Sequence, residues 1–225
     1  MARLSGNVLG NLSGRLGNLS ARTVEGQTIL AARPSSFEVS QSPASIEARK
    51  KFAVTGNFAK FILDIVSLAE IWLKSKLPGM SVYNTTFKHN YQFSDSDKPT
   101  INNIITPGGF GLPVTSATLA ADSLSMELGA LNTVALFSAE EVDLSIASLV
   151  LYHNPTDPDD LPYQIIKLTK EEAGFDFTSA YTGSINFDVV QQGIASKYQN
   201  SILYLAVASK LADGKVVQYS ATHSQ

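Results

Sequence analysis

The spacing of apolar residues changes near residue 100 of this chain, and that change limits the possible folds more than any other sequence feature. Before it, apolar residues recur every three or four positions, as on the buried face of an amphipathic helix. After it, short stretches either alternate between apolar and polar residues or are apolar throughout, as strands are. Because the two patterns occupy separate parts of the chain, the sequence predicts an α+β fold.

The helical pattern has recognisable start and stop signals. Ser42 is suited to cap a helix and Pro43 to occupy its first position. The pattern continues to Pro78-Gly79, which ends it, and Gly56-Asn57 is predicted to kink or split the helix. A second, shorter helix is predicted where apolar residues lie 3, 4 and 4 positions apart, at Met80, Tyr83, Phe87 and Tyr91.

The strand pattern predicts an antiparallel, sandwich-like domain from about Ile101 onward. Ser148–Tyr152 and Ser201–Ser209 are nearly continuous apolar stretches, which we expect to form strands buried on both faces. Asp213-Gly214 is a turn signal that joins the second stretch to Lys215–Ser220 in a hairpin. Alternation is clear in two further sets, Leu124, Met126 and Leu128, and Ile185, Phe187 and Val189.

The first part of the chain is rich in glycine, asparagine, serine and leucine. A β-hairpin is predicted within Leu16–Ala32, with its turn at Glu25-Gly26, and Arg33-Pro34 ends the pairing because proline has no N–H to donate. The chain is therefore expected to have three parts. These are a glycine-rich strand arm (residues 1–41), a helical segment (42–100) and an antiparallel β domain (101–225).

The arm carries apolar residues that it cannot bury by itself, since an isolated hairpin is only marginally stable in water. The candidate contact residues are Leu9, Leu12, Leu16, Leu19, Val24, Ile29 and Leu30. They require an apolar surface or a sheet edge, either on the same chain or on a neighbouring copy that receives the arm by strand addition. Charged residues make up only 16% of the chain, which favours surfaces covered by neighbours and hence docking on another copy.

No sequence motif predicts catalysis, a metal site or a cofactor. Cysteine is absent, no serine lies in a GxSxG motif, and the three histidines His89, His153 and His223 lack the spacing of metal ligands. The glycine-rich stretch Pro107–Gly111 has no Lys-Ser/Thr after it, and it is predicted to be a flexible loop or a subunit contact.

The segment from Asn154 to Asp160 leaves one question open. Asp157, Asp159 and Asp160 offer the oxygen ligands that calcium prefers, but the spacing of an EF-hand is missing. The two prolines of this segment also fit an ordinary turn. Calcium binding is therefore not decided by the sequence.

The distribution of charge bears on the partners of the chain. The formal net charge is −3, so nucleic acid is not expected to be attracted. Residues 1–51 hold seven basic and three acidic residues, a balance of +4, which leaves −7 for the remainder. The first residues do not form a secretory signal, and charges interrupt the apolar stretch Phe58–Leu73, so no membrane partner is expected.

Several short motifs together resemble an uncharacterised family, a domain of unknown function, found mainly in Bacteroidota. They are LGNLSGRLGN at Leu9–Asn18, EARKKFA at Glu47–Ala53, Tyr83-Asn84 with Asn90, and ILYLAVASKLADGKVVQYSATHS at Ile202–Ser224. The resemblance implies a glycine-rich strand element, a helical middle and a sandwich-like end, and it implies no catalytic residues. The sequence departs from it at Gln27-Thr28, where the family tends to have bulkier or basic residues.

These features favour a non-catalytic structural subunit that assembles with copies of itself and with other structural proteins. A phage virion, or a virion-like component, is the expected particle; it would be assembled in the cytoplasm and released as an extracellular particle. No cofactor and no small-molecule substrate are expected. A cell-surface binding or adhesion module is the alternative, and an enzyme of unknown type is a second one.

Overall fold

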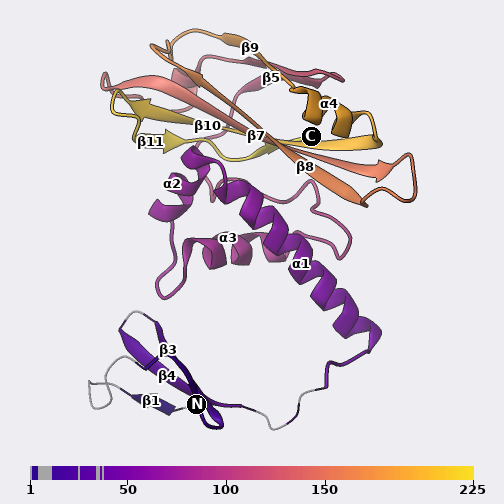
Figure 1. Ribbon diagram of the computed structural model, residues 1–225. Coiled ribbons are helices and arrows are strands. Elements are labelled where there is room, and N and C mark those ends of the chain that lie inside the picture. Colours follow the sequence, from indigo (N-terminus) through magenta and orange to yellow (C-terminus); the bar gives the residue numbers. More distant parts are fainter. Residues whose placement is uncertain (1, 5–11, 25, 34–35, 37) are drawn as a thin grey trace. The chain divides into compact units, whose positions relative to one another are not determined.

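The computed structural model describes residues 2–4, 12–24, 26–33, 36 and 38–225 (Figure 1). They fall into two compact units, Met1–Ile46 and Glu47–Gln225. Leu9, Glu25 and Pro34, which the sequence analysis singled out, lie outside the described residues. The fold is α+β, as predicted, with a small antiparallel sheet first, then helices, and then larger antiparallel sheets.

The first unit is a four-stranded antiparallel sheet in the order β1-β4-β3-β2. The predicted hairpin is confirmed, because β3 and β4 pair from Leu19↔Ala32 to Val24↔Gln27. Two further strands extend it into a sheet. The four strands are β1 (Ala2–Leu4), β2 (Gly14–Leu16), β3 (Leu19–Val24) and β4 (Gln27–Ala32).

Three helices open the second unit: α1 (Pro43–Leu63, which begins in the first unit), α2 (Val66–Lys74) and α3 (Val82–Tyr91). The predicted second helix is confirmed as α3, which Ser81 caps by accepting a hydrogen bond from the Asn84 N–H. The predicted kink at Gly56-Asn57 is wrong, because α1 is continuous there. The bend comes between α1 and α2 and measures 106°.

Packing explains why the helix continues through Gly56 and why the bend lies further along the chain. The Tyr83 hydroxyl donates to the Gly56 carbonyl at 3.2 Å, and a Cβ at Gly56 would come within 2.7 Å of that hydroxyl. Glycine therefore permits a close approach of α3 to α1 and does not break the helix. The bend instead lies at Ile65, whose backbone is extended and whose side chain is buried.

The remaining strands form two antiparallel sheets. The larger has the order β11-β10-β7-β8, with β12 added beside β10, and the smaller has the order β5-β6-β9. The strands of the larger sheet are β7 (Glu141–Pro155), β8 (Tyr163–Glu172), β10 (Tyr198–Leu211), β11 (Val216–Tyr219) and β12 (His223–Ser224). Those of the smaller sheet are β5 (Val114–Leu119), β6 (Ser123–Leu128) and β9 (Tyr181–Asn186). A 3-10 turn, η1 (Leu131–Thr133), and a short helix, α4 (Val189–Ala195), complete the unit.

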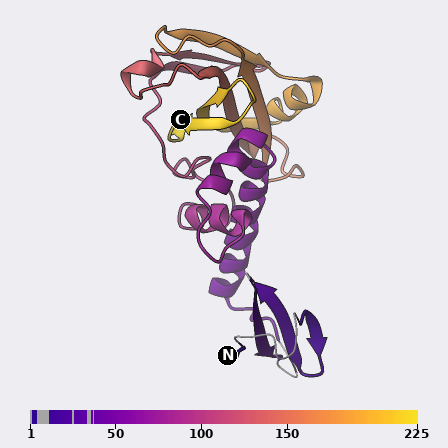
Figure 2. The ribbon, with the colours of Figure 1, turned by 90° about the vertical axis from the view of Figure 1, so that its left-hand side faces the viewer.

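The second unit has three layers, with the smaller sheet and α4 on one face of the larger sheet and α1, α2 and α3 on the other (Figures 1 and 2). Successive residues of β7 and β10 therefore belong to different hydrophobic clusters. Leu144, Ile146 and Val150 pack toward the smaller sheet, whereas Leu149 and Leu151 pack with the helices. This arrangement confirms that the two apolar stretches predicted as strands are buried on both faces.

The expected alternation of Ile185, Phe187 and Val189 holds only in part. Phe187 is buried, but β9 ends at Asn186, and Val189 is 84% exposed as the first residue of α4. Asp188 and Gln191 form a capping box, in which each side chain binds the other residue's backbone N–H. This reciprocal cap stabilises a helix start and overrides the alternation.

The glycine-rich stretch Pro107–Gly111 is attached to the sheet. The Phe110 N–H donates to the Tyr219 carbonyl at 3.1 Å, and the Phe110 carbonyl accepts from Ala221 at 2.7 Å. Gly109 has a φ of 112°, and a Cβ there would come within 2.2 Å of the Tyr219 carbonyl oxygen. The glycine thus permits close backbone pairing with the sheet, and the expectation of a flexible loop or a subunit contact stays a prediction.

Candidate functional site

The two faces of the N-terminal sheet differ in chemistry. Directly paired residues in an antiparallel sheet share a face, and neighbours along a strand do not. The pairs Leu16↔Leu19 and Ala21↔Leu30 therefore belong to one face. The pairs Arg15↔Ser20 and Arg22↔Ile29 belong to the other. We call the first the leucine face and the second the arginine face.

The leucine face is only partly buried. Among the residues of the first unit whose exposure is described, only Ala21 and Thr28 are buried, and Leu16 is 56% exposed. No described residue of this unit belongs to either hydrophobic cluster of the protein. A sheet gains most of its stability by packing one apolar face against another layer. The leucine face is therefore a candidate docking surface.

The structure separates the predicted contact residues into groups. Leu16, Leu19 and Leu30 share the leucine face, whereas Val24 and Ile29 lie on the arginine face. Leu12 precedes β2, and its carbonyl accepts a hydrogen bond from the Thr23 hydroxyl at 3.3 Å. Leu9 lies outside the described residues.

The edges of the sheet are a second route to a partner. β1 and β2 are its outer strands, and each pairs with a neighbour on one side within the described sheet. All three residues of β2 are exposed. An unprotected edge of this kind can accept an added strand.

A groove lined by aromatic residues lies between α1 and α3, and the sequence analysis did not single it out as a site. Its volume is about 350 Å³, and it is lined by Phe52, Met80, Tyr83, Asn84, Phe87, Lys88 and Tyr91. Phe87 is the centre of the cluster, with ring centroids 4.5 Å from Phe52 and 5.5 Å from Tyr91. Phe52 is nevertheless 59% exposed. The 3-4-4 spacing of apolar residues in α3 was the sequence signal for one side of the groove. No sequence pattern indicated that Phe52 of α1 would complete it.

The carboxylate of Glu141 is buried, and a buried carboxylate is a candidate for catalytic chemistry. It accepts hydrogen bonds from the Ser138 N–H at 2.8 Å, from the Ser209 hydroxyl, and from the Gln218 amide at 3.2 and 3.3 Å. Burial raises the pKa of Glu141, but these hydrogen bonds outweigh burial, and the net pKa lies below its ordinary value of 4.5. These hydrogen bonds keep the carboxylate ionised, and they link β7, which carries Glu141, to β10 and β11.

The lowered pKa of Glu141 predicts a pH-dependent contribution to stability. A depressed carboxyl pKa stabilises the fold above the unfolded value, and this stability is lost as the pH falls through the folded pKa. We expect Glu141→Gln to lower the free energy of unfolding by about 1–3 kcal/mol at pH 7. The difference should shrink below about pH 4, as chemical denaturation at several pH values would reveal. A difference independent of pH would contradict this account.

The histidines lie in three different elements. His89 of α3 packs edge-on against Trp72, with ring centroids 5.4 Å apart. His153 of β7 has a pKa lowered by burial and by Lys98. His223 of β12 pairs with Leu205.

Ser148, which is buried, and His223, which is partly buried, lie on the same row of the larger sheet. Leu205 pairs with Ser148 on one side and His223 on the other. Two strand spacings, about 10 Å, therefore separate the backbone of Ser148 from that of His223. Neither the Ser148 Oγ nor the His223 Nε2 has a hydrogen-bond partner, so the two do not form a nucleophile–base pair.

The acidic loop between β7 and β8 has two of its carboxylates engaged in other contacts. The Asp160 carboxylate is ion-paired with Lys197 at 2.8 Å, and the Asp157 carboxylate accepts from the Asp159 N–H at 3.0 Å. Within the part of the chain that the structure describes, no group of three or more His, Asp or Glu side chains is arranged to hold a metal ion. Whether this loop binds calcium stays open.

In the described ranges, no helix taken singly combines the length and hydropathy needed to cross a membrane. Among the described helices, α1 and α2 together reach that length and composition, and they meet at the 106° bend.

Comparison of the chain with protein-family models, with curated proteins and with solved structures gives no match. The resemblance to the Bacteroidota family stays a prediction.

Proposed function

We propose that this chain is a non-catalytic structural subunit that assembles with copies of itself, and that its N-terminal sheet is the element that connects the copies. A phage virion or a virion-like particle is the class of assembly that the proposal names. The observation that carries it is the leucine face, on which Leu16, Leu19 and Leu30 stand together outside both hydrophobic clusters.

The energetics favour an apolar contact as the connector. Burying one leucine side chain stabilises a contact by about 1.5–3 kcal/mol, whereas an exposed ion pair contributes about 0–1 kcal/mol. Three leucines therefore outweigh several ion pairs. Assembly through this face is expected to persist at high salt, where ion pairs between exposed groups are screened.

A pair of point variants tests the proposal. Leu16→Asp places a charge on the leucine face, and because Leu16 is 56% exposed, the change leaves the sheet folded. Val24→Asp is the matched control, since Val24 is 36% exposed and lies on the arginine face. We expect Leu16→Asp to raise the concentration needed for assembly by about tenfold or more, because it removes the burial of a leucine and desolvates a charge.

The measurement is the mass of each protein by light scattering at micromolar concentration, in low and high salt. The intact chain and Val24→Asp should form species well above the monomer mass of 24.1 kDa, and Leu16→Asp should not. An intact chain that stays monomeric at every concentration would reject self-assembly. Equal effects of the two variants would reject the leucine face as the connector.

A further inference from the structure

The aromatic groove and the acidic β7–β8 loop have opposite charge, and both lie in the second unit. The helices α1 and α3, which form the groove, carry five basic residues against one acid, Glu47, and of these Lys88 lines the groove and Lys51 lies over the ring of Tyr91. The loop Asn154–Pro162 carries Asp157, Asp159 and Asp160 and no basic residue. Opposite charges across a contact speed encounter and fix its register.

The groove presents its cations beside its aromatic rings. Lys88 lines the groove and is exposed, and the Lys51 ammonium lies 5.1 Å from the centre of the Tyr91 ring. Phe52 and Tyr83, 59% and 39% exposed, present apolar ring surface along it. Such a surface suits a short acidic segment that also carries an apolar side chain and prolines.

The β7–β8 loop is such a segment, and its shape is fixed. The Thr156 N–H donates to the Lys197 carbonyl at 2.8 Å, and the Tyr198 hydroxyl donates to the Leu161 carbonyl at 2.9 Å. The ion pair between Asp160 and Lys197 also fixes the loop to the start of β10. The side chains of the loop stay accessible to a partner, since Leu161 is 62% exposed and Asp159 is also exposed. A loop held in this way loses little conformational entropy when it binds.

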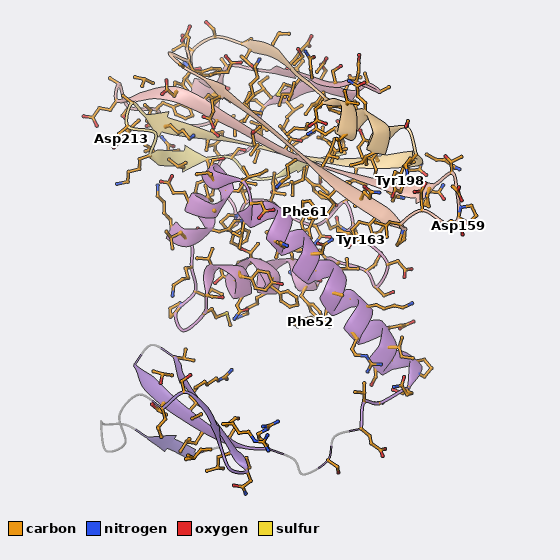
Figure 3. The ribbon with its side chains drawn as sticks, viewed as in Figure 1. Phe52, Phe61, Asp159, Tyr163, Tyr198 and Asp213 are labelled. Atoms are coloured by element: carbon orange, nitrogen blue, oxygen red, sulfur yellow. The ribbon has the colours of Figure 1, made fainter. Side chains whose placement is uncertain are left out.

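We propose that the aromatic groove of one copy binds the β7–β8 loop of a second copy, with Leu161 against the aromatic rings and Asp159 near Lys88. Figure 3 shows Asp159 at the outer tip of the loop and Phe52 on α1, at a different place on the same unit. The contact therefore joins two different surfaces and propagates as a ring or a filament. This inference rests on the proposed self-assembly and names a second contact for it.

Charge reversal tests the pairing in the intact chain. Lys88→Glu and Asp159→Lys each place like charges in the contact, and the double variant restores opposite charges. We expect each single variant to raise the concentration needed for assembly by about tenfold, and the double variant to return it to within about threefold of the intact chain. Sedimentation velocity over a concentration series measures this, and circular dichroism verifies folding.

Two controls carry the same changes of charge elsewhere. Lys60→Glu alters α1 outside the groove lining, and Asp213→Lys alters the β10–β11 turn, which Figure 3 shows at the opposite end of the sheet from Asp159. Both should assemble as the intact chain does. Loss of assembly in either control to the same degree as in the single variants would overturn the specific pairing.

The remaining outcomes separate this inference from the proposed function. If Leu16→Asp prevents assembly while both charge reversals leave it unchanged, the structural role stands and the loop contact is rejected. If Lys88→Glu weakens assembly but Asp159→Lys does not, the groove binds another segment, and the loop is again rejected. If the intact chain is monomeric throughout, both proposals fail.

Discussion

Replacing Trp72 by alanine is expected to lower the free energy of unfolding by about 3–5 kcal/mol, the range for removing a large aromatic side chain from a core. Trp72 is fully buried among the residues that join the helices to the larger sheet. Its indole N–H donates to the Ile105 carbonyl at 2.9 Å. The substitution therefore leaves both a cavity and an unsatisfied buried carbonyl.

Leu73→Ala is the matched control, because Leu73 is the next residue of α2 and is 58% exposed. Its effect should stay within about 0.5 kcal/mol. Urea denaturation followed by circular dichroism measures both variants, and all proteins must be compared at one concentration because assembly adds to apparent stability. A loss below about 1 kcal/mol for Trp72→Ala would contradict the packing of the helices on the sheet.

The strands of the second unit were largely predictable because their signals are local. β7 and β10 are apolar on both faces, and Asp213-Gly214 marks the turn before β11, where Gly214 has a φ of 84°. A short turn marked by Asp-Gly and continuous apolar stretches require no knowledge of distant residues. The order of the strands in the two sheets was not predictable, since it depends on pairings such as β6 with β9 that lie far apart in the sequence.

The segment between α3 and β5 shows why other features could not be predicted. Asn90 is fully buried, and its side chain binds both the N–H and the carbonyl of Ile104, at 2.9 and 3.0 Å. Asn103 donates to the Asn90 side chain at 3.0 Å. One asparagine therefore fixes an irregular segment through contacts 13 and 14 residues away. The spacing of apolar residues in the sequence does not predict that a buried asparagine fixes this segment.

For the candidate surfaces, the sequence indicated which residues are involved but not which of them share a face. The leucines of the arm stood out, but their division between two faces depends on the pairing of β2 with β3 around Gly17-Asn18. That pairing adds a strand to the predicted hairpin and places Leu16 beside Leu19. Likewise, α3 showed its aromatic face, whereas Phe52 joins the groove only through the packing of α1 on α3.

Removing the N-terminal sheet is expected to have the largest effect on assembly. A chain of residues 42–225 keeps Ser42, whose carbonyl accepts from the Ile46 N–H at 3.0 Å, so the start of α1 remains intact. It also keeps both hydrophobic clusters. The shortened chain should therefore fold. It lacks the leucine face, and if that face supplies the connection, the shortened chain should not assemble.

The most direct measurement compares the mass of this shortened chain with that of the intact chain by light scattering, at equal micromolar concentration. It is made in high salt, which screens the charges of the groove–loop contact that the shortened chain keeps. Circular dichroism confirms that both are folded. The account predicts a multimeric intact chain and a folded, monomeric shortened chain. A shortened chain that is folded and forms the same species as the intact chain would contradict the claim that the N-terminal sheet connects the copies.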